Sequence, residues 1–198
     1  MARDGPVVYP LCPGVNVVEP TKALLLIDLQ NDYFPGGDYE LARIEAAGGT
    51  AAEVLDRFRR DGRPVFHVRH EFPTVDAPFF RPGSTGAAIH KSVAPLPTEA
   101  VITKQHINAF AQTDLKAQLD AIGVKNLVVV GAMSHMCIEG ATRAAADFGY
   151  GVEVIHDACA TRDQEFNGRS VAAADVHAAS MAALGFGYAK VLAFQDWK

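Results

Sequence analysis

Hydrophobic residues cluster in six short runs along the chain, and each run has the length and composition of a β-strand. Several runs are apolar at consecutive positions and rich in β-branched residues, which is typical of strands that are buried on both faces. The first predicted strand is the apolar run of KALLLIDLQ (22–30), which meets an acid at Asp28. The other predicted strands are PVFHVRH (64–70), AVITK (100–104), 127–131, GVEVIHD (151–157) and AKVLAF (189–194).

Segments with apolar residues at helical spacing separate these strands. One stripe consists of Leu41, Ile44, Ala51, Leu55 and Phe58. Further helices are predicted over 113–123, after the strand at 127–131, and over 169–184. Strands that alternate with helices predict an α/β fold with a parallel sheet covered on both faces. Such sheets bind their ligands at the carboxyl ends of the strands.

Composition narrows the class of protein. The chain has 198 residues, 49% of them hydrophobic and 21% charged, and its formal net charge is −5. We expect one domain over residues 1–198, with a proline-containing extended arm at 1–20 and a long loop at 70–98. There is no basic run, zinc-finger spacing or long apolar stretch, so we expect no nucleic acid partner and no membrane contact.

Cysteine usage indicates the compartment. Cys12, Cys137 and Cys159 are three in number and widely separated, which is more typical of a reducing compartment than of a disulfide framework. The N-terminus carries no signal-peptide pattern. We therefore expect a cytoplasmic protein.

Three reactive side chains stand at or just after predicted strand ends. Asp28 follows the first strand, Lys104 ends the third, and Cys137 lies between the fourth strand and the next helix. The topology predicts that they converge on one rim of the sheet. A helix N-terminus and a lysine favour the attacking thiolate, while a carboxylate can accept the thiol proton and return it. This set predicts acyl transfer: attack on an amide, release of an amine, and hydrolysis of a thioester.

Each of these residues also has a non-catalytic interpretation. Cys137 can be a small buried hydrophobic residue, Asp28 can cap a turn, and Lys104 can be a solvated charge at a strand end. Two other functions stay open on the residues alone: a non-catalytic ligand-binding or assembly module, and a thiol redox sensor. The absence of a second cysteine near Cys137 in the sequence argues against the sensor.

Three longer segments resemble the isochorismatase-like cysteine hydrolase superfamily: LLLIDLQNDYFPGG (24–37), VITKQHINAFAQTDL (101–115) and LVVVGAMSHMCIEGATRAAADFGYGVEVIHDACATRD (127–163). The resemblance covers most of residues 22–194. It implies a three-layer α/β/α, Rossmann-like fold with a six-stranded, mostly parallel sheet. It also implies a catalytic triad, which falls on Asp28, Lys104 and Cys137. A cis peptide bond is implied between Ala132 and Met133, with the Met133 and Cys137 N–H groups forming an oxyanion hole. Members commonly oligomerise, so we expect a homo-oligomer, a dimer or a tetramer.

The resemblance also bears on metals and on the reaction. Nicotinamidases of this superfamily bind a metal through an Asp-x-His pair after the second strand, where this chain has His67 and His70. Residues three apart in a strand face opposite sides, so the two imidazoles cannot easily share an ion. We expect no metal and no cofactor. Because the thiol is retained, we expect cleavage of a C–N bond in a small amide or carbamoyl compound, with isochorismatase-type vinyl-ether hydrolysis as the alternative.

A small-molecule substrate requires lining residues at the same rim. Two phenylalanines are candidate apolar walls, with core packing as an equally good interpretation, and three histidines are candidate polar contacts. We expect Ser134 to help hold the bend before the cysteine. The candidate substrate-binding residues are Phe34, His70, His106, Phe110 and His135.

Overall fold

The computed structural model describes residues 21–197. The expected arm at 1–20, with Cys12, lies outside the described residues. The main strands are β1 (Thr21–Ile27), β2 (Val65–His70), β3 (Ala100–Lys104), β4 (Val124–Ala132), β5 (Gly151–Ala160) and β8 (Lys190–Leu192). The helices are α1 (Ile44–Arg60), α2 (Leu115–Ala121), α3 (Glu139–Asp147) and α4 (Ala173–Gly187). Short helical turns are η1 (Asn31–Tyr33), η2 (Lys91–Val93), η3 (Ser134–Ile138) and η4 (Phe194–Asp196), of which η3 is a π-turn.

The six main strands form one sheet in the order β3-β2-β1-β4-β5-β8, and every neighbouring pair is parallel. The chain first moves outward from β1 through β2 to β3, and then returns to β4 on the other side of β1. The order of the strands therefore reverses between β1 and β4. In open parallel sheets, this reversal leaves a crevice at the carboxyl ends of the two strands.

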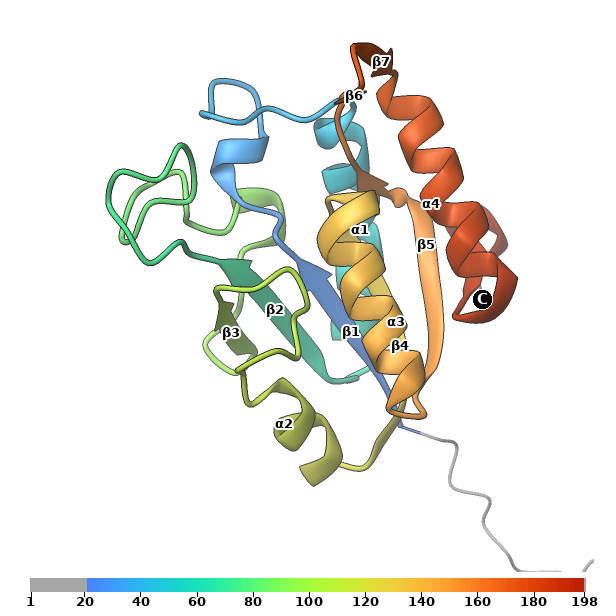
Figure 1. The fold of residues 1–198 in the computed structure, drawn as a ribbon. Coiled ribbons are helices and arrows are strands. Elements are labelled where there is room, and N and C mark those ends of the chain that lie inside the picture. Colours follow the sequence, from blue (N-terminus) through green and yellow to red (C-terminus); the bar gives the residue numbers. More distant parts are fainter. Residues whose placement is uncertain (1–20, 198) are drawn as a thin grey trace, which may run out of the picture.

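Helices cover both faces of the sheet, which gives the expected three layers (Figure 1). On one face, Ala51, Val54 and Leu55 of α1 pack in one core cluster with Leu24 and Val128. On the other face, α2, α3 and α4 contribute apolar side chains to a second cluster with Leu25 and Val129. Consecutive residues of β1 and β4 alternate between these clusters, as they must when both faces are buried.

The predicted helix over 169–184 begins later than expected. Residues before it form a small antiparallel hairpin of β6 (Gln164–Phe166) and β7 (Arg169–Val171). Its two turn residues, Asn167 and Gly168, both have positive φ, at 50° and 70°. This is the Asn-Gly pairing that two-residue hairpins favour. The prediction was wrong here because the two strands are short and mostly polar.

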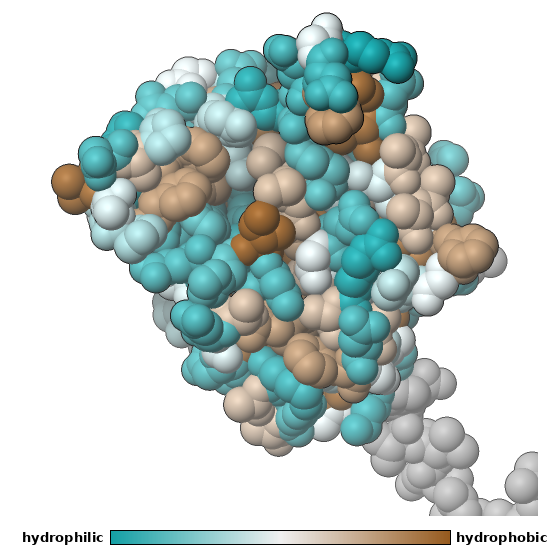
Figure 2. Space-filling model, in the orientation of Figure 1, coloured by the Kyte–Doolittle hydropathy of each residue, from teal (hydrophilic) through white to brown (hydrophobic). Residues whose placement is uncertain are grey.

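The segment between β2 and β3 is, as expected, a long loop with a single short turn, η2. Its first part carries the half-buried rings of Phe72 and Phe79 and the buried ring of Phe80, which pack on each other. Phe72 N–H donates to Phe80 O at 3.0 Å, so the two ends of this bend are tied together. Hydrophobic atoms gather on the surface over this loop, at the left in Figure 2.

Across residues 21–197, we find no helix with the length and apolar character needed to cross a membrane.

Candidate active site

Three strand ends bring Asp28, Lys104 and Cys137 together. Lys104 Nζ lies 2.7 Å from Asp28 Oδ2 and 3.3 Å from Cys137 Sγ. The side chains of Asp28 and Lys104 are fully buried, and Cys137 is 6% exposed. Asp28 comes directly after β1, Lys104 is the last residue of β3, and Cys137 lies in η3 after β4. A carboxylate, an ammonium and a thiol therefore share one closed site at the rim of the sheet.

The backbone at the strand reversal places Asp28 and the bend before Cys137. Asp28 has a φ of 53°, and its N–H donates to Val68 O at 2.8 Å. Gly131, near the end of β4, has a φ of 129°, and a Cβ there would lie 2.0 Å from Ile27 O. Only glycine lets β1 and β4 approach this closely just before the two reactive residues.

Burial raises the pKa of the Cys137 thiol well above its usual range, and the negative charge of Asp28 raises it further. The ammonium of Lys104 acts in the opposite direction but does not offset these two causes. Lys104 favours the thiolate as expected, but burial and Asp28 outweigh it, so the thiol keeps its proton in the free protein. A base has to accept this proton when sulfur attacks, and Asp28 is the carboxylate beside it.

Lys104 is a cation in this site. Burial alone lowers the pKa of Lys104, but the Asp28 carboxylate and Cys137 outweigh burial, so the pKa is raised overall. The positive charge of Lys104 and the negative charge of Asp28 therefore balance each other inside the protein. Breaking such a buried pair by removing one partner leaves an uncompensated charge.

His67 and His70 lie on opposite faces of β2. His67 is buried, and its Nε2 lies 2.9 Å from Glu99 Oε2. His70 ends β2, and its Nδ1 lies 3.1 Å from Lys104 Nζ. The two imidazoles therefore have different partners and no common position to bind. Within the part of the chain that the structure describes, no three His, Cys, Asp or Glu side chains are grouped as metal ligands would be.

The bend between β4 and Cys137 is held by contacts with the end of β5, with the residue after it and with α4. The Ala132–Met133 peptide bond is cis. Ser134 Oγ donates to Ala160 O at 3.2 Å and lies 2.8 Å from Nδ1 of His177 in α4. Nδ1 of His135 lies 2.7 Å from Thr161 Oγ1, so this candidate substrate contact ties η3 to the segment after β5.

Two buried residues near the site were not identified from the sequence, Gln30 and Tyr33. Burial raises the pKa of Tyr33 far above its usual value, and the negative charge of Asp28 raises it further. Gln30 is fully buried and hydrogen-bonds both backbone groups of His70. In the sequence, both residues follow Asp28 closely, in the segment just after a buried strand, and this position could have identified them.

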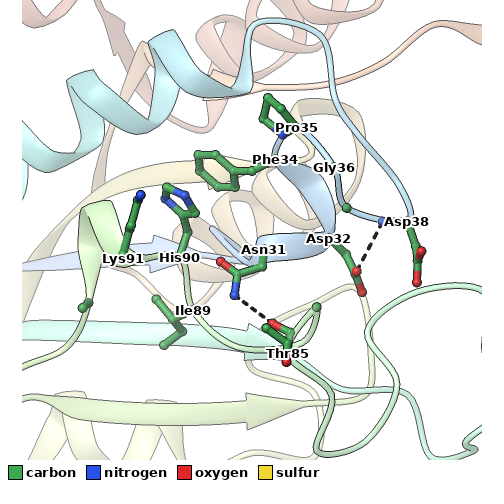
Figure 3. A pocket seen from close by; sticks show the side chains of 13 residues that line it. Asn31, Asp32, Phe34, Pro35, Gly36, Asp38, Thr85, Ile89, His90 and Lys91 are labelled. Atoms are coloured by element: carbon green, nitrogen blue, oxygen red, sulfur yellow. Dashed lines mark hydrogen bonds between the residues drawn. The ribbon is translucent and has the colours of Figure 1, made fainter.

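Phe34 lies in a surface groove that Asp28, Lys104 and Cys137 do not line. The Phe34 ring stacks on His90, with centroids 3.6 Å apart, along a groove of about 690 Å³ formed by residues 31–38 and 85–94 (Figure 3).

Phe110 and His106 follow β3 but have different surroundings. Phe110 packs against Phe148 and Tyr150, with ring centroids 5.4 Å and 6.3 Å away. Phe148 ends α3, and a nine-residue helix is about 14 Å long, so this cluster lies at the other end of α3 from Cys137. Phe110 is thus a core residue of the structure. His106 is exposed and close enough to the site to influence the charge of His70.

A parallel sheet covered by helices on both faces places the protein in the α/β class. The buried carboxylate, ammonium and thiol at its strand reversal are the side chains that a cysteine hydrolase requires. The isochorismatase domain model matches residues 22–184, which is most of the chain. The protein belongs to the isochorismatase family.

Relatives share the sequence and the fold over most of the chain. An uncharacterized isochorismatase family protein of Bacillus subtilis, YddQ, is 49% identical over 171 residues, covering 86% of this chain and 95% of YddQ. A streptothricin hydrolase of Streptomyces noursei is 36% identical over 151 residues, covering 72% of this chain and 50% of that protein. The structure of a proposed isochorismatase hydrolase from Oleispira antarctica superimposes with a TM-score of 0.87 at 56% identity, covering 90% of this chain and 96% of that one.

Proposed function

We propose that this protein is a cysteine hydrolase that cleaves the C–N bond of a small amide or carbamoyl compound through a thioester on Cys137. One observation carries the proposal: the Lys104 ammonium contacts both the Asp28 carboxylate and the Cys137 thiol inside a closed site. A buried ion pair is often no more stabilising than hydrophobic residues of the same volume, so this pair is weak evidence for a structural role. Nucleophilic catalysis is the function that this set of side chains fits. Relatives named streptothricin hydrolase, nicotinamidase and ureidoacrylate amidohydrolase support the choice of C–N bonds.

In the first half of the reaction, Cys137 Sγ attacks the carbonyl carbon while Asp28 accepts the thiol proton. The negative charge thus moves from Asp28 through sulfur to the carbonyl oxygen. We assign the stabilisation of that oxygen to the backbone N–H groups of Met133 and Cys137. Lys104 keeps a positive charge beside the sulfur throughout. When the tetrahedral intermediate collapses, the C–N bond breaks, and protonated Asp28 returns its proton to the leaving amine.

The second half repeats the same steps with water as the nucleophile. Asp28, again a carboxylate, accepts a proton from water as the water oxygen attacks the thioester carbon. The C–S bond breaks, sulfur takes the proton back from Asp28, and the acid product leaves. Each residue ends in its starting protonation state, so the cycle consumes only the substrate and one water molecule.

A panel of primary amides, ureido acids and nicotinamide tests the proposal through the release of ammonia. Wild type, Cys137→Ala and Cys159→Ala are compared with and without a metal chelator. Cys159 is a matched control because it is also a buried free thiol, hydrogen-bonded to Ile155 O rather than to a charged group. We expect release from wild type and Cys159→Ala only, unaffected by the chelator.

Activity retained in Cys137→Ala would contradict the thioester mechanism. An acyl adduct on Cys137, seen in the intact mass of wild type during turnover, would support the mechanism directly. Isochorismate is included with pyruvate detection. Pyruvate release without ammonia release from any amide would replace C–N cleavage by vinyl-ether hydrolysis.

A further inference from the structure

His70 is the fourth side chain in the buried cluster. It is 8% exposed, and its Nδ1 lies 3.1 Å from Lys104 Nζ. The register of β2 and β3 pairs His70 with Lys104, so both side chains leave the sheet on the same face. Because β2 lies between β3 and β1, Lys104 has to pass over β2 at His70 to reach Asp28.

The contacts of Lys104 determine which nitrogen of His70 carries the proton. An ammonium has three N–H donors and no acceptor, so His70 Nδ1 accepts and the neutral ring carries its hydrogen on Nε2. Lys104 then has one partner for each donor: Asp28 Oδ2, Cys137 Sγ and His70 Nδ1. We infer that His70 is a positioning residue, whose Nδ1 takes the third N–H of Lys104 and holds the ammonium between Asp28 and Cys137.

His70 is itself held in place by Gln30, from the segment after β1. Gln30 Nε2 donates to His70 O at 2.7 Å, and His70 N–H donates to Gln30 Oε1 at 2.7 Å. The same Gln30 nitrogen donates to Ala87 O at 2.7 Å. The ring of Phe72 packs edge-on against His70, with centroids 4.5 Å apart. The backbone and the ring are therefore both fixed, which a positioning role requires.

The second ring nitrogen indicates that His70 is not present for stability. Nε2 is buried and has no hydrogen-bond partner among residues 21–197. Such an unsatisfied donor destabilises a folded protein. Burial and the charge of Lys104 lower the pKa of His70 to about 4, with Asp28 opposing and His106 adding to the effect. The ring is therefore neutral at pH 7 and able to accept.

Two variants separate positioning from packing. His70→Leu removes the acceptor, whereas His70→Asn places a carbonyl oxygen near the position of Nδ1. The readout is the rate of Cys137 alkylation by iodoacetamide between pH 7 and 10, followed by peptide mass spectrometry, with Cys159 as the reference thiol. The charged and titratable groups around this thiol are Asp28, Lys104 and Tyr33.

We expect His70→Leu to slow alkylation at pH 8.5 about tenfold, equivalent to one unit of thiol pKa, and His70→Asn to restore it to within about twofold. An unchanged pH profile in His70→Leu would overturn the inference. A His70→Asn variant that melts at the wild-type temperature but alkylates slowly at Cys137 would also overturn the inference. The slower alkylation would then not depend on the hydrogen-bond acceptor.

A measurement on wild type keeps the inference testable even where His70→Leu does not fold. Long-range ¹H–¹⁵N correlation spectra report which ring nitrogen of His70 carries hydrogen. We expect the Nε2–H form from pH 8 down to about pH 5. Hydrogen on Nδ1, or a protonated ring at pH 7, would overturn it. The inference rests on the proposed function only for the role of Cys137 as nucleophile. Neither readout needs a substrate, so failure of one proposal is distinguishable from failure of the other.

Discussion

At the scale of single residues, the site holds its charge on Asp28 and Lys104 and keeps the sulfur neutral. The two charged groups form an ion pair at 2.7 Å. Burial disfavours the Cys137 thiolate most, and Asp28 destabilises the thiolate more than Lys104 stabilises it. A neutral thiol in a closed site is protected against oxidation and alkylation, because only the thiolate reacts readily. Under the proposed mechanism, the nucleophile is formed only when a substrate carbonyl is present to take the electron pair.

Asp28→Asn separates the reactivity of the thiol from catalysis. Removing the negative charge lowers the pKa of Cys137, so we expect faster alkylation by iodoacetamide at pH 7.5 than in wild type. Amide hydrolysis is expected to fall by about 10²–10⁴-fold because the proton acceptor is lost. Alkylation and ammonia release are measured on the same preparation.

Asp32→Asn is the control for this experiment. Asp32 is also buried, but its carboxylate accepts from Phe80 and Asp38 N–H groups rather than facing the thiol. We expect its alkylation profile to match that of wild type. If Asp28→Asn alkylates more slowly than wild type, Asp28 does not raise the thiol pKa, and its assignment as the base is wrong.

At the scale of elements, the backbones of β1 and β4 approach each other closely at Gly131. Gly131→Ala would place a methyl group 2.0 Å from Ile27 O, at a φ of 129° that L-residues avoid. We expect the free energy of unfolding to fall by about 3 kcal/mol or more. The measurement is a urea denaturation midpoint, taken alongside the alkylation rate of Cys137.

Gly149→Ala provides a matched comparison for Gly131→Ala. Gly149 also has a positive φ, at 89°, but a Cβ there meets nothing within 4 Å. We therefore expect Gly149→Ala to lower the free energy of unfolding through the backbone preference alone, by about 1 kcal/mol. Equal losses in the two variants would show that contact with Ile27 contributes nothing.

The elements also show what the sequence could predict. Apolar runs identified all six main strands, and the polar residues after them identified Asp28 and Lys104 as rim residues. The alternation of side chains along β2 correctly predicted that His67 and His70 lie on opposite faces. The hairpin at 164–171 was missed although Asn167-Gly168 is a strong turn signal, because its strands are three residues long and mostly exposed. The pKa of the Cys137 thiol could not be predicted from the sequence, because it depends on burial and on Asp28, which is distant from Cys137 in the sequence.

At the scale of the whole molecule, five buried or half-buried histidines contribute to the response to acid. Burial lowers the pKa of five histidines, and for each it is the largest cause: His67, His70, His90, His135 and His177. In the unfolded chain these rings protonate near pH 6.5, while in the folded protein they stay neutral to lower pH. The unfolded state therefore binds more protons in this range, so stability is complete above pH 6.5 and is lost as the pH falls.

We expect the urea midpoint to decrease steadily between pH 7 and pH 5, with more than one proton taken up per molecule unfolded at pH 5.5. The slope of unfolding free energy against pH gives this number directly. Because the pKa of His70 is about 4, its contribution to the loss of stability continues down to about pH 4. His70→Asn should therefore flatten the dependence of unfolding free energy on pH in that range. A midpoint that is constant from pH 7 to pH 5 would contradict this account of the histidines.

The position of Lys104 in the sheet has a consequence for how the protein loses activity. Its strand, β3, has five residues, lies at the edge of the sheet and pairs with β2 alone. Edge segments with few neighbours open at a lower free energy than the central strands do. If β3 opens while β1, β4 and β5 stay paired, the ammonium leaves the site and the rest of the fold survives. Backbone amides of β3 should then exchange with solvent faster than those of β4, and inactivation in mild denaturant should precede global unfolding.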